Sequence, residues 1–189
     1  MEVLKREYYT MESGNDYTIE DIFALPEGVR AELYDGEMVM QATPTITHQL
    51  LLSWFVVEIN LHIRNKGGNC LVLPAPFGVF IKKDNKNFYE PDISVICDRD
   101  KLDEKGCHGA PDWVIEILSP STKKYDCGKK LSTYIEAGVR EYWLVDPERK
   151  RVVVYRLEEP DLPQMYLFGE EIEVGILEGL KLTVPEKVL

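Results

Sequence analysis

The sequence predicts an α/β fold in which a mixed β-sheet is flanked by helices. Three observations predict it: one long amphipathic helix, several short apolar runs bounded by turn residues, and the alternation of helical and strand patterns along the chain. The chain has 189 residues, of which 44% are hydrophobic, so it can bury a sizeable core without the help of disulfides or a structural metal. We expect residues 1–17 to be flexible and residues 18–189 to form a single domain.

The first ordered elements are a short helix and a β-hairpin. Thr18 is a candidate helix cap, because Asp21 follows three positions later, ahead of an apolar run. Asp35-Gly36 separates two runs in which apolar and polar residues alternate, which is a strong signal for a two-residue hairpin turn. We therefore expect an N-terminal β-hairpin ahead of the main sheet.

A long helix follows the hairpin. It runs from His48 to Lys66 and ends at Gly67-Gly68. Its apolar residues recur every four positions, which places them on one face: Leu51, Phe55, Ile59 and Ile63. This face is expected to pack on the sheet.

Apolar runs with turn residues between them predict the strands of the sheet. They occupy residues 70–74, 77–81, 92–97, 112–118, 141–145 and 151–156, with further short strands after Gly169. A second helix is expected between residue 122 and Ala137, where Gly138 ends it. The C-terminal runs are extra strands beyond the central sheet.

The charge of the chain limits its partners. Lys and Arg number 22 and Asp and Glu 33, so the net charge is −11. A protein this acidic has no broad attraction to phosphate backbones or anionic membranes, and any nucleic-acid site must be local. No apolar stretch has the length of a signal peptide or a membrane span, which predicts a cytoplasmic protein without membrane contact.

The four cysteines are widely spaced in a chain large enough to need no disulfide: Cys70, Cys97, Cys107 and Cys127. We therefore expect free thiols in a reducing compartment. Cys107-His108 lacks the second ligand pair that a zinc site uses. The sequence also lacks the G-x-S-x-G, Walker and dinucleotide-binding motifs.

Two acids sit where the predicted strands could bring them together. Glu116 lies within an apolar strand, and Asp92 lies at the mouth of another. A buried carboxylate needs a cation or hydrogen-bond donors, and carboxylate oxygens suit Mg²⁺ or Mn²⁺. Two plainer interpretations stay open: Asp92 caps a loop, and Glu116 pairs with a lysine.

Lys130 is that lysine in the predicted second helix, with Tyr134 four positions later on the same face. Beside metal-bound carboxylates, such a lysine stabilises a phosphate transition state or orients a water; alternatively it only pairs with Glu116. Glu32 in the hairpin and His48 at the helix start are weaker candidates. From the pattern alone, a solvated acid and a surface or capping histidine are the more common explanations of these two residues.

Several segments together resemble the bacterial Uma-two family, a branch of the PD-(D/E)xK nuclease superfamily. They are ELYDGEMV at 32–39, His48-Gln49, PDISVI at 91–96, PDWVIEILSPST at 111–122, the 126–134 helix and AGVREYWLVDP at 137–147. The resemblance spans about residues 18–184. It implies a restriction-endonuclease-like core that presents acids around Mg²⁺.

The resemblance also implies roles for individual residues. Asp92 matches the PD aspartate and Glu116 the second acid, while Leu118 stands where the superfamily pattern has lysine. In the Uma-two branch the lysine stands on the following helix. Lys130 occupies that position here, so the resemblance implies that Lys130 takes its role. Glu32 and His48 match further site positions, Glu32 as a third metal ligand.

The resulting hypothesis is a metal-dependent endonuclease that hydrolyses phosphodiester bonds, with DNA as partner and a homodimer as a possible assembly. Local attraction for DNA would come from Lys82, Lys83, Lys123, Lys124 and Lys129. Two alternatives remain open. One is a non-catalytic module with a nuclease fold, which the acidity favours; the other is a hydrolase of a different phosphoester. Metal binding separates the first alternative from the nuclease.

Overall fold

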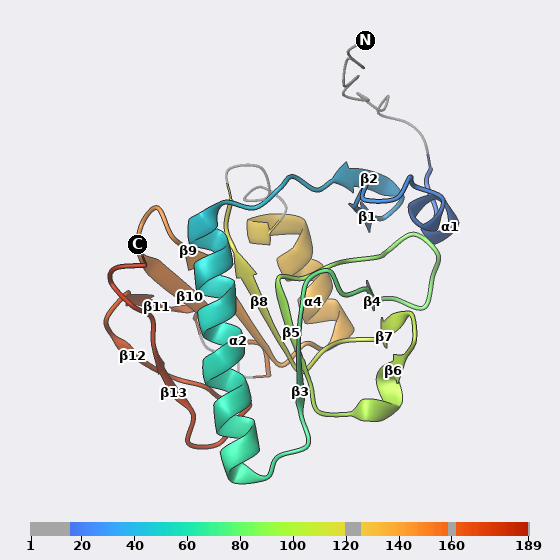
Figure 1. Ribbon diagram of the computed structural model, residues 1–189. Helices are drawn as coiled ribbons and strands as arrows, with labels where there is room; N and C mark the ends of the chain where they lie inside the picture. The colour runs from blue at the N-terminus through green and yellow to red at the C-terminus, as the bar shows by residue number, and fades with distance from the viewer. Residues whose placement is uncertain (1–15, 120–125, 159–161, 189) are drawn as a thin grey trace.

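The central element of the fold is a six-stranded mixed β-sheet (Figure 1). The computed structural model describes residues 16–119, 126–158 and 162–188. The strand order is β11-β10-β9-β8-β5-β3. In chain order the strands are β3 (Leu71–Pro74), β5 (Ile93–Ile96), β8 (Trp113–Ile117), β9 (Glu141–Asp146), β10 (Arg151–Arg156) and β11 (Gln164–Leu167). Strands β8 and β9 are parallel and all other neighbours are antiparallel, so the predicted mixed sheet is confirmed.

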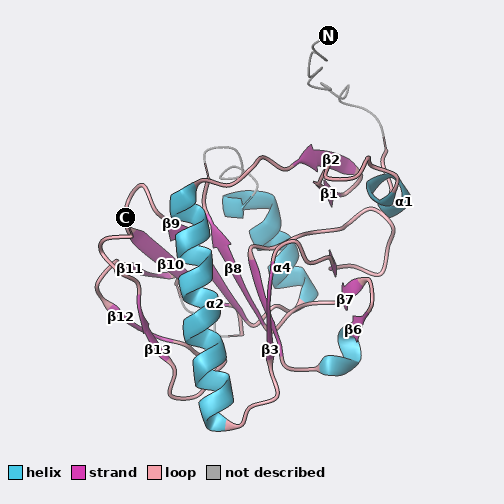
Figure 2. Ribbon diagram, viewed as in Figure 1, coloured by secondary structure: helices cyan, strands magenta, loops and turns pink. Residues whose placement is uncertain are grey.

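One helix covers each face of this sheet. Figure 2 shows the long helix α2 (Ile46–Lys66) in front of the sheet and α4 (Leu131–Ala137) behind it. Alternate residues of β8 belong to the two cores: Trp113 packs on the α2 side and Val114 on the α4 side. Strand β8 is thus buried on both faces, as its continuous apolar run predicts.

The sequence pattern explains where α2 begins and ends. The Thr45 hydroxyl accepts a hydrogen bond from the His48 amide at 3.2 Å and caps the first turn. Gly67 ends the helix with a φ of 66°, a conformation that glycine adopts without strain. The predicted apolar stripe is buried at all four positions: Leu51, Phe55, Ile59 and Ile63.

The predicted hairpin forms a small sheet of its own at the top of Figure 1. It pairs β1 (Ala31–Tyr34) with β2 (Glu37–Met40) and packs beside α1 (Ile19–Phe23). Both turn residues have positive φ, 49° at Asp35 and 85° at Gly36, as an Asp-Gly turn requires. A pair of backbone hydrogen bonds, between Leu33 and Phe88, ties the hairpin to the chain ahead of β5.

Besides the hairpin, five short strands of the described chain form two smaller sheets outside the main sheet. Strand β4 (Val79–Phe80) pairs in parallel with β7 (Gly106–His108), which in turn pairs with β6 (Leu102–Asp103) after the short 3₁₀ helix Arg99–Lys101. The C-terminal strands β12 (Glu171–Glu173) and β13 (Lys181–Thr183) form a separate ribbon. The ribbon agrees with the extra C-terminal strands that we expected, whereas the prediction that residues 77–81 join the central sheet was wrong, because apolar alternation identifies a strand but not its partner.

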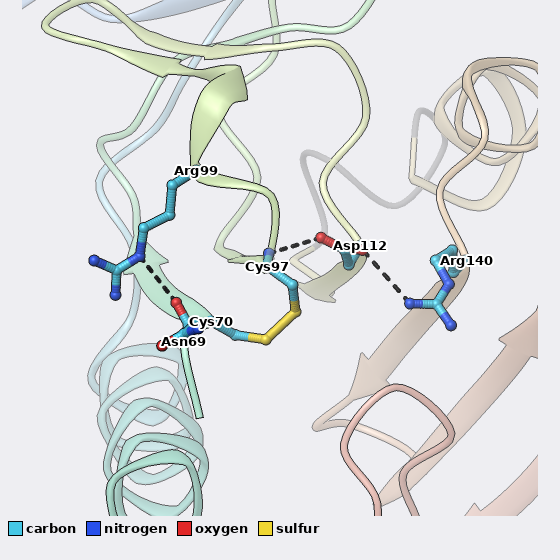
Figure 3. Close-up of a disulfide and its surroundings, with 6 residues drawn as sticks. All are labelled: Asn69, Cys70, Cys97, Arg99, Asp112 and Arg140. Carbon is cyan, nitrogen blue, oxygen red and sulfur yellow. Dashed lines mark hydrogen bonds and ion pairs between the residues drawn. A yellow bond between two sulfur atoms is a disulfide. The ribbon is translucent and has the colours of Figure 1, made fainter. Parts of the chain in front are cut away.

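The prediction of four free thiols was also wrong. Cys70 and Cys97 form a disulfide between the ends of the neighbouring strands β3 and β5 (Figure 3). These residues are 27 positions apart in sequence, and only the antiparallel pairing of Leu71 with Ile96 brings them together. Cys107 is a buried free thiol whose pKa burial raises to about 11. The cysteine pattern therefore does not support a reducing compartment.

The N-terminal segment that we expected to be flexible lies outside the described residues up to residue 15. Its last two positions are bonded to the hairpin region: the Tyr17 amide donates to the Gly36 carbonyl, and Asp16 pairs with Lys86. Among the helices that the structure describes, none has the length and apolarity to cross a bilayer.

Candidate active site

Glu116 is a buried carboxylate near the end of the central strand β8. Its side chain lies on the α4 face of the sheet, where two described side-chain donors reach it: Lys130 from the turn ahead of α4 and Tyr134 from α4 itself. Lys130 Nζ lies 2.8 Å from Oε1, and the Tyr134 hydroxyl donates to the same oxygen at 3.1 Å. The four-residue spacing of Lys130 and Tyr134 thus brings both to one acid, as the sequence predicts.

Lys130 is held between two acids. Its Nζ lies 3.1 Å from Oε1 of Glu32 as well as 2.8 Å from Glu116, and its side chain is only 3% exposed. Lys130 ends a five-residue π-helical turn, Asp126–Lys130, that precedes α4. Such turns are rare and occur often at functional sites. The contact with Glu116 agrees with the interpretation that Lys130 only forms an ion pair. The contact with Glu32 goes beyond it, because an ion pair requires one acid and Lys130 has two.

Asp92 lies at the mouth of β5, beside the end of β8. Its Oδ2 accepts a hydrogen bond from the Ile117 amide at 2.7 Å and lies 3.2 Å from His48 Nε2. Its own amide donates to Glu116 Oε2 at 3.3 Å. Backbone donors therefore fix both carboxylates relative to one another, and His48, from the first turn of α2, orients Asp92.

Glu32 enters the site from the hairpin and is fully engaged there. Its Oε1 accepts a hydrogen bond from the Glu90 amide at 2.8 Å in addition to the contact with Lys130. Its Oε2 accepts a short hydrogen bond from the Tyr34 hydroxyl. These partners make Glu32 an anchor for Lys130.

The two tyrosines of the cluster act as proton-bearing donors. Burial raises the pKa of both Tyr34 and Tyr134 well above the ordinary value. The nearby carboxylates raise these pKa values further, whereas the Lys130 ammonium lowers them. Both hydroxyls thus stay protonated and donate to Glu32 and Glu116 throughout the physiological pH range.

A pocket of about 250 Å³ opens over this cluster, where the hairpin, the start of α2 and the end of β8 meet at the top of Figure 1. Four carboxylates line it: Glu32, Glu90, Asp92 and Glu116. The cations among its described lining residues are Arg30 and Lys130. The acids outnumber these cations by two, so the pocket suits a divalent cation better than a bare phosphate.

A larger cavity of about 490 Å³ lies between β10, β11 and the loop after β12. Its cation Arg156 already donates to the side chain of Gln164 at 2.6 Å and to the Glu173 carbonyl at 2.8 Å. Among its described lining residues, no cation is bonded to two carboxylates as Lys130 is in the smaller pocket. We therefore take the smaller pocket as the candidate active site, because it gathers buried charges in contact with one another.

All five predicted site residues meet in this pocket: Glu32, His48, Asp92, Glu116 and Lys130. Of the surface lysines expected nearby, Lys82, Lys83 and Lys129 do not line it. Lys82 pairs with Asp35 and Glu136, Lys129 pairs with Glu37, and Lys123 and Lys124 lie outside the described residues. Within the described ranges, no three His, Cys, Asp or Glu side chains gather closely enough to hold one ion.

Sequence reasoning missed three residues of the site: Arg30, Tyr34 and Glu90. Arg30 and Tyr34 lie two positions on either side of Glu32 along the hairpin strand, so the alternation of strand side chains places all three on one face. Glu90 lies two positions before Asp92. The same alternation, applied outward from Glu32, points to Arg30 and Tyr34, whereas Glu90 lies ahead of β5 outside a strand and carries no such signal.

The sequence from the first helix to the C-terminal ribbon matches a known protein family. The family described as "Uma2: Putative restriction endonuclease" matches residues 19–185. This chain belongs to the Uma2 family. The matched range includes every residue of the pocket cluster. In this Uma2 protein Lys130 reaches Glu116 from the turn ahead of α4.

Two individual proteins are similar to this Uma2 chain. An uncharacterized protein of Synechocystis sp. (strain ATCC 27184 / PCC 6803 / Kazusa) is 26% identical over 125 residues, which cover 66% of this chain and 64% of that protein, just under two thirds of its length. A crystal structure titled as a putative nuclease of DUF820 from Anabaena variabilis ATCC 29413 has a TM-score of 0.72 and 24% identity, covering 88% of this chain and 94% of that one. The fold is therefore the one found in that structure.

Proposed function

We propose that this Uma2 protein is a metal-dependent endonuclease that hydrolyses phosphodiester bonds in DNA. One observation carries the proposal: a buried lysine lies between two acids, beside a third acid at the strand mouth, in a pocket open to solvent. Family membership supports the reaction class and the choice of DNA, which rests on analogy.

The donor set fits Mg²⁺ or Mn²⁺. Asp92 and Glu116 would hold the cation, because backbone amides fix their hard carboxylate oxygens side by side. Mg²⁺ uses one or two protein carboxylates and completes its shell with water and substrate phosphate. When bound, such a cation lowers the pKa of a coordinated water and polarises a phosphoryl oxygen.

The other residues of the cluster support this pair. The Lys130 ammonium stabilises negative charge that develops on the phosphoryl oxygens as the water oxygen bonds to phosphorus and the bond to the leaving sugar oxygen breaks. Glu32 and Tyr34 hold Lys130 in place. We assign Glu32 this anchoring role because its Oε1 contacts Lys130 directly. Metal ligation by Glu32, which the family resemblance implies, stays a prediction. His48 positions Asp92.

The test is cleavage of supercoiled plasmid and of single-stranded DNA with Mg²⁺, with Mn²⁺ and with EDTA. Wild type is compared with Glu116→Gln and Lys130→Met, and Glu58→Gln in α2 is the matched control for a charge lost elsewhere. We expect cation-dependent nicking in wild type and Glu58→Gln, and its loss in the two site variants. Nicking that survives in either site variant contradicts the proposal.

Calorimetric titration of Mn²⁺ distinguishes the nuclease from a non-catalytic binding module with this fold. We expect one site in wild type that Asp92→Asn and Glu116→Gln remove and Glu58→Gln retains. Wild type that neither binds the cation nor cleaves DNA indicates the binding module, which the acidic charge favours. Cation binding without DNA cleavage indicates a different phosphoester substrate.

A further inference from the structure

Among the described residues that line the pocket, Arg30 is the more accessible of the two cations. Its side chain is 36% exposed, whereas the Lys130 side chain is 3% exposed and bridged to two acids. Both residues line the same pocket. The mechanism proposed above uses Lys130 and gives Arg30 no role, although a guanidinium is well suited to binding phosphate oxygens.

A single carboxylate orients Arg30 and leaves part of its guanidinium available. Its Nε and Nη2 lie 2.8 and 2.6 Å from the same oxygen, Oε2 of Glu90. Nη1 makes no hydrogen bond to a described residue. Glu90 is itself fixed, because its amide donates to Glu32 and Pro91 separates it from Asp92. The guanidinium is thus held at a defined place relative to both acids.

Arg30 is displaced from the centre of the site along the hairpin strand. The Gln41 amide donates to the Arg30 carbonyl at 2.9 Å, which continues the β1–β2 ladder to Arg30. Arg30 and Glu32 are therefore alternate residues on one face of an extended chain, about 7 Å apart along it. Glu32 contacts Lys130, and Lys130 is the residue proposed to stabilise the phosphate that is hydrolysed. Arg30 is therefore displaced by about the same 7 Å from that phosphate.

We propose that Arg30, oriented by Glu90, binds a second phosphate of the nucleic-acid strand, next to the phosphate that is hydrolysed. This inference rests on the proposed function. It makes Arg30 a specificity-determining residue, through which the site distinguishes a polynucleotide from an isolated phosphodiester. It also gives this acidic protein a local cation for its anionic substrate.

Binding is measured first, because it does not require hydrolysis. Fluorescence anisotropy in Ca²⁺ compares a labelled eight-nucleotide oligothymidylate with a labelled thymidine dinucleotide, which has one phosphodiester. We expect Arg30→Gln to reduce the preference for the longer strand at least tenfold and Arg30→Lys to reduce it less. The salt dependence of log affinity for the longer strand should fall by about 0.7 in Arg30→Gln, the value for one single-strand phosphate contact.

Arg64→Gln is the matched control. It removes one exposed positive charge near the other end of α2, 16 residues after His48 and so about 24 Å along the helix. This variant should bind both nucleotides as wild type does. A preference unchanged in Arg30→Gln, or lowered equally in Arg64→Gln, overturns the proposal.

Kinetics then separate this inference from the proposed function. In Mg²⁺ the ratio of kcat/KM between the two substrates should fall at least tenfold in Arg30→Gln, which a merely structural role for Arg30 would not produce. Equal losses on both substrates overturn the inference. Strand binding that depends on Arg30 without hydrolysis by wild type supports the inference and contradicts the proposed function.

Discussion

The two ends of the central strand pair β8–β9 carry buried acids in different surroundings. At one end Glu116 contacts a buried lysine and a tyrosine beneath an open pocket. At the other end Glu141 accepts hydrogen bonds from the Trp143 indole and from the amides of Gly175 and Ile176. The two glutamates are equally inaccessible, 3% and 1% exposed, so burial does not distinguish them.

The nature of the partners distinguishes the two ends. Around Glu141 the donors are fixed groups that join β9 to the C-terminal segment, and nearby Asp112 binds the Cys97 amide and Arg140 beside the disulfide (Figure 3). Around Glu116 one partner is a buried ammonium shared with a second acid. A buried acid thus indicates a catalytic role when it pairs with a cation that also contacts a second acid in a pocket. It indicates a structural role when backbone and indole donors satisfy its oxygens.

The largest expected effect compares the two glutamates directly. Glu116→Gln should lower the rate of metal-dependent DNA cleavage by about 100-fold or more, because the site loses a charge that acts on the reacting phosphate. Glu141→Gln should stay within about threefold of wild type per folded molecule. Initial nicking rates on supercoiled plasmid measure both. Equal losses in the two variants would break the comparison.

The second effect is on stability at the Glu116 end. Lys130→Met leaves Glu32 and Glu116 buried without their shared cation and should cost about 3–5 kcal/mol in the free energy of unfolding. Its neighbour Lys129 is the control, because its pair with Glu37 is exposed and worth about 0–1 kcal/mol. Urea unfolding of Lys130→Met and Lys129→Met gives the two values. Similar losses in the free energy of unfolding for the two variants would mean that Lys130 does not compensate the charges of Glu32 and Glu116.

The third effect is on stability at the disulfide end. Cys70→Ser with Cys97→Ser opens a link between residues 27 positions apart and should cost about 3.5 kcal/mol by loop-closure entropy. Cleavage activity of the folded variant should not change, since the disulfide lies at the opposite end of β5 from Asp92. Urea unfolding with and without dithiothreitol tests this. Only wild type should respond to the reductant; an equal response of the double variant contradicts the assignment.

The smallest effect is the pH dependence due to Glu141. Desolvation raises the pKa of Glu141 above its ordinary value of 4.5, against the opposing hydrogen bonds from Trp143 and the backbone. Between these two pKa values the folded state binds more protons than the unfolded state, so the stability from Glu141 is lost as pH rises through the higher one.

The corresponding variant is Glu141→Gln, which should cost about 1–3 kcal/mol near pH 4.5 because one donor loses its acceptor. The advantage of wild type should then shrink towards neutral pH. Unfolding of both proteins between pH 4 and pH 7 gives this difference directly. An advantage that grows with pH would reverse the assigned direction of the pKa shift.

Local patterns in the sequence predict the elements of this fold well. The stripe on α2, the Asp35-Gly36 turn and the apolar run of β8 each follow from the spacing of a few residues, and all three predictions are confirmed. The pairing of strands could not be predicted in the same way. The separate β4-β7-β6 sheet and the Cys70–Cys97 disulfide depend on contacts between distant segments, which the spacing of residues along the chain does not contain.

The same difference between local spacing and distant contacts applies to the candidate site. Strand alternation and helical spacing single out Glu116 and its pairing with Lys130, whereas Glu32 and His48 rest mainly on family resemblance. The engagement of both Glu32 oxygens could not be predicted, because the Glu90 amide and the Tyr34 hydroxyl reach it only in the folded structure. The chemical roles of these residues stay predictions until the variants are measured.

The separate hairpin has a consequence for how the protein would lose activity on heating. Arg30, Glu32 and Tyr34 all belong to the β1–β2 ladder, which is hydrogen-bonded to Phe88 and forms no part of the six-stranded sheet. Small units of this kind open locally at a lower free energy than global unfolding. Hairpin opening would remove three site residues in one event while the sheet and its helices stay folded. Thermal inactivation should therefore precede the melting of the domain.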